Sequence, residues 1–287
     1  MPELPEVEIV KRSLKNKVKY KKIKKIIISN RNLRFKIQKN FENLLEGRSI
    51  ITVSRFSKYI ILTLDNYSFC LIHLGMSGTL HLIKYKKKTK VTNLSFYQSK
   101  ILPKKHNHIK IKFYNFTIVY NDPRRFGFFK IINSKKELKK YFQKFGPEAN
   151  SSKFDIKYIK YKFLNKKKNI KNFLLDQNFV SGIGNIYANE ILFYSKINPF
   201  KEAKKLSDKE IKKISKYSKI VLNLSIKFGG SSIRDFKSTK GIPGLFQNNF
   251  KVYNRQSENC VRKNCKGKII KTFISNRSSF FCKFCQK

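Results

Sequence analysis

The carboxyl-terminal part of the chain contains the sequences CVRKNC, from Cys260 to Cys265, and CKFC, from Cys282 to Cys285. Two cysteine pairs with sixteen residues between them (266–281) have the spacing of a zinc ribbon, in which four thiolates surround one tetrahedral ion. A zinc ion bound by four thiolates has no open coordination position. The sequence therefore predicts one structural zinc site, and the alternative of four chance free thiols is disfavoured by the spacing.

The residues between the two pairs predict a β-hairpin. Ile269–Phe273 and Phe280–Cys282 are rich in β-branched and aromatic residues, and residues 275–277, ending at Arg277, are expected at the turn. An arginine at the tip of a zinc hairpin suits contact with DNA. Many zinc ribbons bind proteins instead, so the hairpin alone leaves the partner open. The fifth cysteine, Cys70, is expected to be a buried strand residue.

Upstream of the hairpin, residues 22–132 predict an all-β domain. Short segments rich in Ile, Tyr and Phe alternate with turn residues, and their density indicates a sandwich or a barrel. A charged loop is expected over Lys84–Lys105. The expected strands are Ile23–Ser29, Ile50–Ser54, Tyr59–Asp65, Phe69–His73, Thr79–Ile83, Ile109–Phe113, Thr117–Tyr120 and Phe128–Ile132.

After Asn133 the hydrophobic pattern changes to helical spacing. Ser207 followed by Glu210 forms a capping box, and Gly229 with Gly230 is expected to end the last helix. The predicted domains are residues 1–132, 133–230 and 231–287. The expected helices are Glu137–Phe145, Ile156–Leu164, Ile170–Asp176, Ile186–Tyr194 and Ser207–Phe228.

The amino terminus offers a nucleophile. Removal of Met1 leaves Pro2 with a secondary amine, and α-amino groups are less basic than lysine side chains. Such an amine attacks a sugar or carbonyl carbon and gives a charged iminium, which is an electron sink. A helix predicted from Pro5 to Lys17 places Pro2 and Glu3 before its positive end, which disfavours protonation of a nearby amine. The simpler interpretation is that a proline at position 2 only permits removal of Met1.

Composition points to a polyanionic partner. The chain has 287 residues and a formal net charge of +48, from 65 Lys and Arg against 17 Asp and Glu. This excess favours nucleic acid first and an acidic membrane second. Part of it reflects a drift toward A/T-rich codons, since Lys, Asn and Ile are abundant and Trp is absent. Without a membrane-spanning run or a signal-peptide pattern, a soluble cytoplasmic monomer is expected.

Five motifs occur in order, and together they resemble the bacterial formamidopyrimidine-DNA glycosylases, which remove 8-oxoguanine and ring-opened purines from DNA. The resemblance runs essentially from end to end. It implies an α+β fold with an N-terminal β-sandwich and flanking helices, a helix-two-turns-helix domain and a C-terminal zinc β-hairpin. The motifs are PELPEVE at Pro2–Glu8, HLGMSG at His73–Gly78, DPRRFG at Asp122–Gly127, GIGNIY at Gly182–Tyr187, and the four-cysteine hairpin ending CQK.

The resemblance implies four catalytic residues. Pro2 attacks C1′ of the damaged nucleotide and forms a Schiff base, while Glu3 protonates the sugar ring oxygen. Lys58 donates a proton during β-elimination and contacts a phosphate. Arg277 holds phosphates and assists δ-elimination. Composition alone would treat Lys58 and Arg277 as solvated surface charges, so only their places in the motifs select them.

The resemblance also implies contacts with damaged double-stranded DNA. Met76, Arg124 and Phe126 fill the gap left by the extruded nucleotide, although core packing is the commoner role for such apolar residues. The glycines beside them favour turns. The other implied contacts are Lys171 near the damaged base, Lys166, His106, Asn185 and Tyr253 at the DNA backbone, and Gly229–Phe236 as the loop that closes over the purine.

Two other functions fit part of the sequence. An endonuclease VIII-like enzyme, which prefers oxidised pyrimidines, shares the Pro-Glu start and the zinc hairpin, whereas Leu4, DPRRFG and HLGMSG favour the purine-specific branch. A non-catalytic zinc-ribbon protein would use only the basic surface and the hairpin. The resemblance to bacterial enzymes further implies a location in the cytoplasm, in association with the nucleoid.

Overall fold

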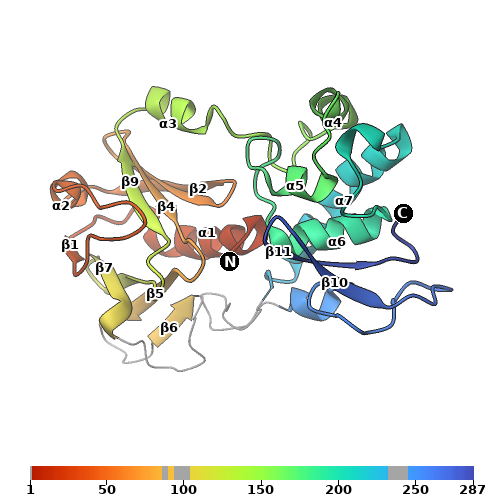
Figure 1. Ribbon diagram of the computed structural model, residues 1–287. Helices are drawn as coiled ribbons and strands as arrows, with labels where there is room; N and C mark the ends of the chain where they lie inside the picture. The colour runs from red at the N-terminus through yellow and green to blue at the C-terminus, as the bar shows by residue number, and fades with distance from the viewer. Residues whose placement is uncertain (1, 86–89, 94–103, 232–244) are drawn as a thin grey trace. The chain divides into compact units, whose positions relative to one another are not determined.

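A computed structural model describes residues 2–85, 90–93, 104–231 and 245–287 (Figure 1). The chain divides into two compact units. The first contains Met1–Gln143 and Phe228–Gln247, and the second contains Lys144–Lys227 and Asn248–Lys287. The unit boundaries are thus set by tertiary contacts, and the chain leaves and re-enters the first unit. The expected loop Gly229–Phe236 lies outside the described residues from position 232 onward.

The first unit contains two antiparallel sheets, one with the order β1-β7-β8-β5-β6 and the other with the order β2-β3-β4-β9. Each predicted strand between residues 22 and 132 is present, with ends that differ by two residues at most. The strands are β1 (Lys25–Ile28), β2 (Ile50–Phe56), β3 (Tyr59–Leu64), β4 (Phe69–His73), β5 (Thr79–Lys84), β6 (Lys90–Asn93), β7 (Asn107–Lys112), β8 (Phe116–Asn121) and β9 (Phe128–Ile132).

Two short elements of this unit escaped the sequence pattern. Strand β6 lies inside the predicted loop 84–105 and pairs with β5, while residues 86–89 and 94–103 of that loop lie outside the described part of the chain. Helix α2 (Phe41–Leu45) has only five residues, too few for helical periodicity to appear. One 3-10 turn, η1 (Lys104–His106), precedes β7.

The core of the first unit lies between the sheets and helix α1 (Leu4–Val18). Val7, Val10, Leu14 and Val18 recur at helical spacing, and all four are buried in one cluster with strand residues. Cys70 of β4 is fully buried in the same cluster, as expected, and burial raises the pKa of its thiol to about 12. This packing fixes α1, and with it the amino-terminal residues, against β2 and β3.

A buried ion pair also joins α1 to β2. Oε2 of Glu8 accepts a hydrogen bond of 2.9 Å from Nε of Arg55, and Oε1 accepts from Lys11 and Arg12. Burial alone raises the pKa of Glu8, but these cationic donors outweigh burial and hold the pKa below its usual 4.5. The charged form of Glu8 therefore stabilises the folded unit above about pH 4.5, and that stabilisation is lost as the pH falls through the lowered folded-state pKa.

We expect Glu8→Gln to lower the free energy of unfolding by about 2 kcal/mol at pH 7, because it leaves the Arg55 guanidinium buried beside an uncharged group. The difference from the unchanged protein should shrink toward zero as the pH falls below 4 in denaturant titrations. Asp208→Asn is the control, since the exposed Lys160–Asp208 pair contributes little. A difference that stays constant from pH 7 to pH 3 would contradict the assignment.

Helix α3 (Lys135–Phe142) covers the outer face of the second sheet. Its N-cap Ser134 accepts a hydrogen bond from the N–H of Glu137, and Leu138, Tyr141 and Phe142 pack on a cluster that includes Ile132. The prediction of this helix as Glu137–Phe145 was correct in type but extended three residues too far. Because α3 packs on β9, it belongs to the first unit.

The second unit is helical and ends in a hairpin. Helix α6 packs against α5 and α7, and α4 packs against α7. The predicted helices are present, and the Ser207–Glu210 capping box forms as expected. The helices are α4 (Ile156–Phe163), α5 (Ile170–Leu175), α6 (Asn185–Ser195) and α7 (Asp208–Lys227), with the 3-10 turn η2 (Ala203–Lys205); the 3-10 turn η3 (Phe246–Asn249) spans the point where the chain passes from the first unit to the second.

Strands β10 (Ile269–Ile274) and β11 (Arg277–Cys282) form the predicted hairpin. Ser275 and Asn276 both have positive φ, 48° and 58°, as a two-residue type I′ turn requires. Ile274 pairs directly with Arg277. Arg277 is therefore the first residue of β11 and not part of the turn, which corrects the sequence expectation. A right-handed strand twist favours this tighter connection over a three-residue turn.

Candidate functional site

The first unit presents the amino-terminal residues at the start of α1. Glu3 is the N-cap and is buried, whereas Pro2 is partly exposed. The backbone N–H of Glu3 donates to Oε2 of Glu6 over 3.0 Å, and the carbonyl of Glu3 accepts from the N–H of Val7. The aligned peptide dipoles of α1 give this end a partial positive charge. Pro2 is thus held next to a fixed helix terminus.

Glu6 is a buried residue to which the sequence analysis gave no role. Its Oε1 accepts hydrogen bonds from the backbone N–H and the hydroxyl of Ser231, at 2.9 and 3.0 Å. Gly230 has a φ of +80°, and a Cβ there would lie 3.2 Å from the same oxygen. One carboxylate therefore contacts both the N-cap of α1 and Ser231, a residue far along the chain. Only the pairing of residues 225 positions apart reveals this role.

Lys58 lies in the tight turn between β2 and β3, after Ser57 with a φ of 53°. Its side chain is buried, with a residue exposure of 7 %, although lysine is seldom buried. Burial, together with the charges of Lys58 and Arg34, lowers the pKa of His73 to about 4. Neutral His73 then accepts a hydrogen bond from the N–H of Gly75. Lys58 is therefore not one of the chain's many solvated surface lysines.

Two further turns of the first unit display the residues assigned to gap filling. Met76, between β4 and β5, and Phe126, between β8 and β9, are each 42 % exposed. The guanidinium of Arg124 lies 4.6 Å from the ring centroid of Phe126. The core-packing interpretation of Met76 and Phe126 is thus wrong. Both are large apolar side chains held at the surface by turns, as the neighbouring glycines predicted.

His106 and His108 are separated in structure. His106 ends η1 and is partly buried, whereas His108 lies in β7 and is buried, with Nε2 2.8 Å from the carbonyl oxygen of Asp122. They are consequently not a pair on one strand. The carbonyl oxygen of His106 accepts a hydrogen bond from the N–H of Asp122, which directly precedes the turn that carries Arg124 and Phe126. This bond links the position of His106 to that turn.

In the second unit, the Gly182–Tyr187 motif forms the predicted tight turn before a helix. Gly182 has a φ of +97°, Gly184 is the N-cap, and Asn185 is the first residue of α6. The amide of Asn185 donates to the carbonyl of Ser278 in β11 over 3.0 Å. The start of a helix favours an anion through its partial positive charge.

Lys171 of α5 is fully buried, and its ammonium group binds the hairpin. Nζ donates to the carbonyl of Ser278 over 2.8 Å and lies 2.6 Å from Oγ of Ser279. Both acceptors follow Arg277 directly in β11. In contrast, Lys166 is exposed in the loop before α5. Within this unit Lys171 therefore acts on the hairpin strand that carries Arg277, a task that its place in the sequence did not indicate.

Glu190 is a second carboxylate to which the sequence analysis gave no role. It is fully buried in α6 and accepts hydrogen bonds from three successive backbone N–H groups, those of Lys251, Val252 and Tyr253. Burial raises its pKa, and these three bonds act in the opposite direction. Tyr253, one of the expected DNA contacts, is thereby fixed and packs edge-on against Phe280. The sequence signal that could have indicated this role is the position of Glu190, an acidic residue within an otherwise apolar helical segment.

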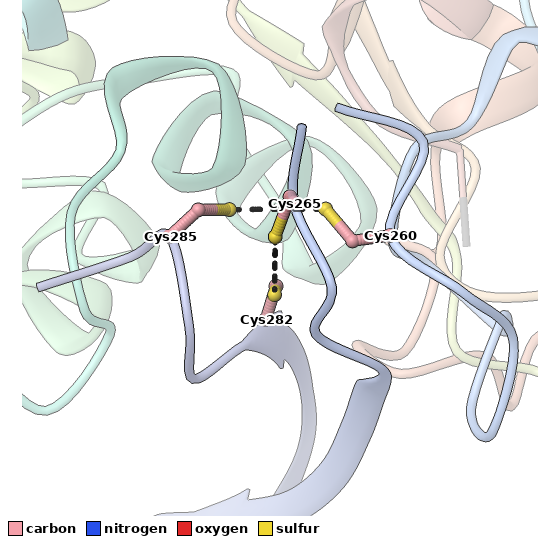
Figure 2. A group of neighbouring side chains, drawn as sticks. All are labelled: Cys260, Cys265, Cys282 and Cys285. Carbon is pink, nitrogen blue, oxygen red and sulfur yellow. Dashed lines mark hydrogen bonds between the residues drawn. The ribbon is translucent and has the colours of Figure 1, made fainter. Parts of the chain in front are cut away.

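The four carboxyl-terminal cysteines converge at the base of the hairpin (Figure 2). All four sulfurs lie within 4.8 Å of one another, with 3.8 Å between Cys260 and Cys285 and 3.6 Å between Cys265 and Cys282. A disulfide requires about 2.05 Å, whereas tetrahedral Zn–S bonds of about 2.3 Å place sulfurs ~3.8 Å apart. The donor set and its spacing fit a tetrahedral ion, and the described residues hold no other such cluster.

The cluster belongs to a small core that ties the hairpin to α6. Cys260 and Cys282 pack with Phe193, Ile269 and Phe280. Arg262, within the first cysteine pair, donates to the carbonyl of Phe193 and lies over its ring. The hairpin base is thus fastened both at the cysteines and at the end of α6.

Among the helices of the described residues, none combines the length and the apolar character that crossing a bilayer would require. Two family models match the chain. The formamidopyrimidine-DNA glycosylase N-terminal domain matches residues 1–129, and the H2TH domain of the same enzymes matches residues 145–237. With the four-cysteine hairpin, this arrangement defines the class of helix-two-turns-helix DNA glycosylases.

Known relatives extend over the whole length. Formamidopyrimidine-DNA glycosylases from Wolbachia sp. subsp. Drosophila simulans and from Rickettsia bellii are each 38 % identical, with 100 % of both chains covered. A Lactococcus lactis Fpg variant in complex with Fapy-dG-containing DNA is 32 % identical with a TM-score of 0.88 over 100 % of both chains. The L. lactis Fpg with abasic-site DNA gives a TM-score of 0.87 at 32 % identity and 99 % coverage of each. The chain belongs to the formamidopyrimidine-DNA glycosylase family.

Proposed function

We propose that this chain excises 8-oxoguanine and formamidopyrimidines from double-stranded DNA and then cleaves the abasic strand by β,δ-elimination. Family membership makes it a DNA glycosylase of base excision repair, with lyase activity known for the family. The relatives solved with Fapy-dG and abasic-site DNA support the substrate class. The observation that carries the proposal is the placement of Pro2 immediately before the buried N-cap Glu3, fixed through Glu6.

The chemistry begins with the Pro2 nitrogen. Its lone pair attacks C1′ of the extruded nucleotide, the glycosidic bond breaks and the base leaves with the electron pair and a proton. Protonation of the ring oxygen by Glu3 opens the sugar and gives the iminium. Loss of a C2′ proton then expels the 3′-phosphate in β-elimination, and a second elimination expels the 5′-phosphate. The iminium stores the electrons in each elimination, so no external oxidant or reductant is needed.

The other catalytic assignments use cations. Lys58 holds its ammonium in a buried turn, where it is close enough to shift the pKa of His73, and serves as proton donor and phosphate contact. Arg277, exposed as the first residue of β11, binds phosphates and assists the second elimination. Fixed cations near a phosphate leaving group stabilise the charge that develops on it.

The DNA contacts divide between the units. Met76, Arg124, Phe126 and His106 act from the first unit, and Lys166, Asn185 and Tyr253 act from the second. Lys171 is proposed to lie near the damaged base, and its ammonium also donates to Ser278 of β11, the strand that begins at Arg277. The proposed domains 1–132, 133–230 and 231–287 would serve catalysis, helix-two-turns-helix binding, and the lesion loop with the hairpin, whereas the compact units assign α3 and residues 228–247 to the first unit.

A structural zinc ion, bound by Cys260, Cys265, Cys282 and Cys285, completes the protein. With four thiolate ligands it supplies folding free energy to the hairpin and no chemistry to the reaction. The proposed location is the bacterial cytoplasm, in association with the nucleoid, and the proposed state is a monomer.

A duplex panel with borohydride tests the proposed function. We expect rapid excision of 8-oxoguanine opposite cytosine, slower action on thymine glycol, and a covalent adduct with DNA after reduction of the iminium. Excision of thymine glycol without action on 8-oxoguanine would support the endonuclease VIII-like alternative. Binding to all duplexes with no adduct would support the non-catalytic zinc-ribbon alternative and reject the proposal.

A further inference from the structure

The three gap-filling side chains stand on two separate turns, residues 75–78 and 123–127, each of which connects a strand of one sheet to a strand of the other. Met76 and Phe126 are exposed, but Ser77 and Gly127, their immediate neighbours, are buried. Unstacking the bases of a duplex costs a few kcal/mol. An apolar side chain that enters the stack must therefore stay in position while the bases tend to restack. Something in the protein must therefore couple the two turns.

That coupling passes through the carboxylate of Asp122, which is fully buried. Its Oδ1 accepts a hydrogen bond of 2.5 Å from the hydroxyl of Ser77 and one of 3.3 Å from the N–H of Arg124. Its Oδ2 accepts a hydrogen bond of 2.9 Å from the N–H of Gly127 and one of 2.8 Å from the hydroxyl of Tyr120. One carboxylate thus binds the first turn through Ser77 and both ends of the second turn.

The same contacts leave the turns little room to shift. A Cβ on Gly75 would lie 2.4 Å from the N–H nitrogen of Gly127, so the two turns touch backbone to backbone. A Cβ on Gly127 would lie 1.8 Å from the Tyr120 hydroxyl. Burial and the charge of Asp122 raise the pKa of Tyr120 well above its ordinary value, which keeps this hydroxyl a donor. Both carboxylate oxygens of Asp122 therefore accept hydrogen bonds from two donors each, within one network that includes both turns.

We infer that Asp122 is a positioning residue for nucleotide extrusion, holding Met76, Arg124 and Phe126 as one rigid wedge. The inference rests on the proposed function, which assigns the gap-filling role to those three side chains. Without the carboxylate, each side chain would have to be ordered separately when it enters the duplex, and that ordering opposes extrusion. Asp122 itself contacts no DNA, because it is buried beneath both turns.

The test compares Asp122→Asn with the unchanged protein on two substrates. The first is 8-oxoguanine opposite cytosine in a duplex, which must be extruded; the second is an abasic site in single-stranded DNA, which need not be. We expect single-turnover excision on the duplex to fall about tenfold or more, while borohydride trapping on the single strand stays within about twofold. A 2-aminopurine base beside the lesion should report slower unstacking in the variant.

Tyr120→Phe and Ser77→Ala provide a second test in case Asp122→Asn does not fold, since each removes only one hydrogen-bond donor to the carboxylate. Both should show the same selective loss on the duplex, at smaller size. Tyr158→Phe is the matched control, because it also removes a tyrosine hydroxyl that donates a hydrogen bond, here to the carbonyl of Phe179. It should leave the ratio of the two substrates unchanged.

The outcomes separate this inference from the function on which it rests. Equal losses on both substrates, or no loss on either, in folded Asp122→Asn, Tyr120→Phe and Ser77→Ala would overturn the positioning role. Absence of an adduct from the unchanged protein on the single-stranded abasic site would instead overturn the proposed chemistry of Pro2.

Discussion

A protein that keeps residues in front of Pro2 is expected to form no borohydride-trapped adduct and to lose excision of 8-oxoguanine. An uncleaved amino-terminal extension turns the Pro2 nitrogen into a tertiary amide, whose lone pair is delocalised into the carbonyl and no longer nucleophilic. We expect the rate to fall by at least about 10⁴-fold, since removal of a covalent nucleophile can cost roughly 10⁶-fold. The measurement is single-turnover excision together with trapping on abasic-site DNA.

The control uses the same extension with a protease site that ends immediately before Pro2. Cleavage should restore both excision and trapping, which shows that the extension acts through the blocked nitrogen. Pro5→Ala is a second control, because it removes a proline from the same helix start without touching the amino terminus. Pro2→Gly should give a smaller yield of covalent adduct, since a primary amine forms an imine that must be protonated to act as the electron sink. Full activity of the blocked protein would reject the proposal.

The second large effect concerns the cysteine cluster. We expect Cys282→Ser, or removal of metal by a chelator, to release one zinc ion per chain and to weaken binding of lesion DNA by about 100-fold or more. Zinc contributes about 10–16 kcal/mol to the folding of small zinc domains. Cys282 is fully buried and contacts that core, so its loss also frees β11 and Arg277.

Metal content, DNA titration and limited proteolysis of the hairpin would be measured together. The matched control is Cys70→Ser, which changes a fully buried cysteine in β4 of the first unit that is not part of the cluster. It should lower stability without changing metal content or the proteolysis pattern of the hairpin. A chelated protein that holds no zinc, and whose hairpin still resists proteolysis and binds DNA, would show that the ion is not structural.

Local sequence patterns predicted much of the fold. The strands of residues 22–132 alternate with turn residues, and α1 repeats Val7, Val10, Leu14 and Val18 at helical spacing, so both were read correctly. The cysteine pairs also carry their own spacing. Errors occurred where local signals are short or end gradually: the five-residue α2, strand β6 within a charged segment, the end of α3, and the turn that precedes Arg277.

The candidate site was predicted by motif position more than by local physics. Lys58 and Arg277 could not be separated from the other basic residues by composition, and the structure distinguishes them differently. Lys58 is buried in a strained turn, whereas Arg277 is exposed at the start of a strand. For Lys171, the structure adds two hydrogen bonds that motif position does not indicate, from its ammonium to Ser278 and Ser279 of the hairpin.

By itself, the sequence determined the nucleophile candidate Pro2, the four thiolates and the family, because each depends on residue identity and near-neighbour spacing. Only the tertiary structure decided how these groups are held. Asp122 reaches Ser77 across 45 positions, Glu190 reaches Tyr253 across 63, and Lys171 reaches Ser279 across 108. A buried charge must find its donors or acceptors wherever the fold brings them. Such pairings leave no periodicity in the chain, so they appear only when the backbone is folded.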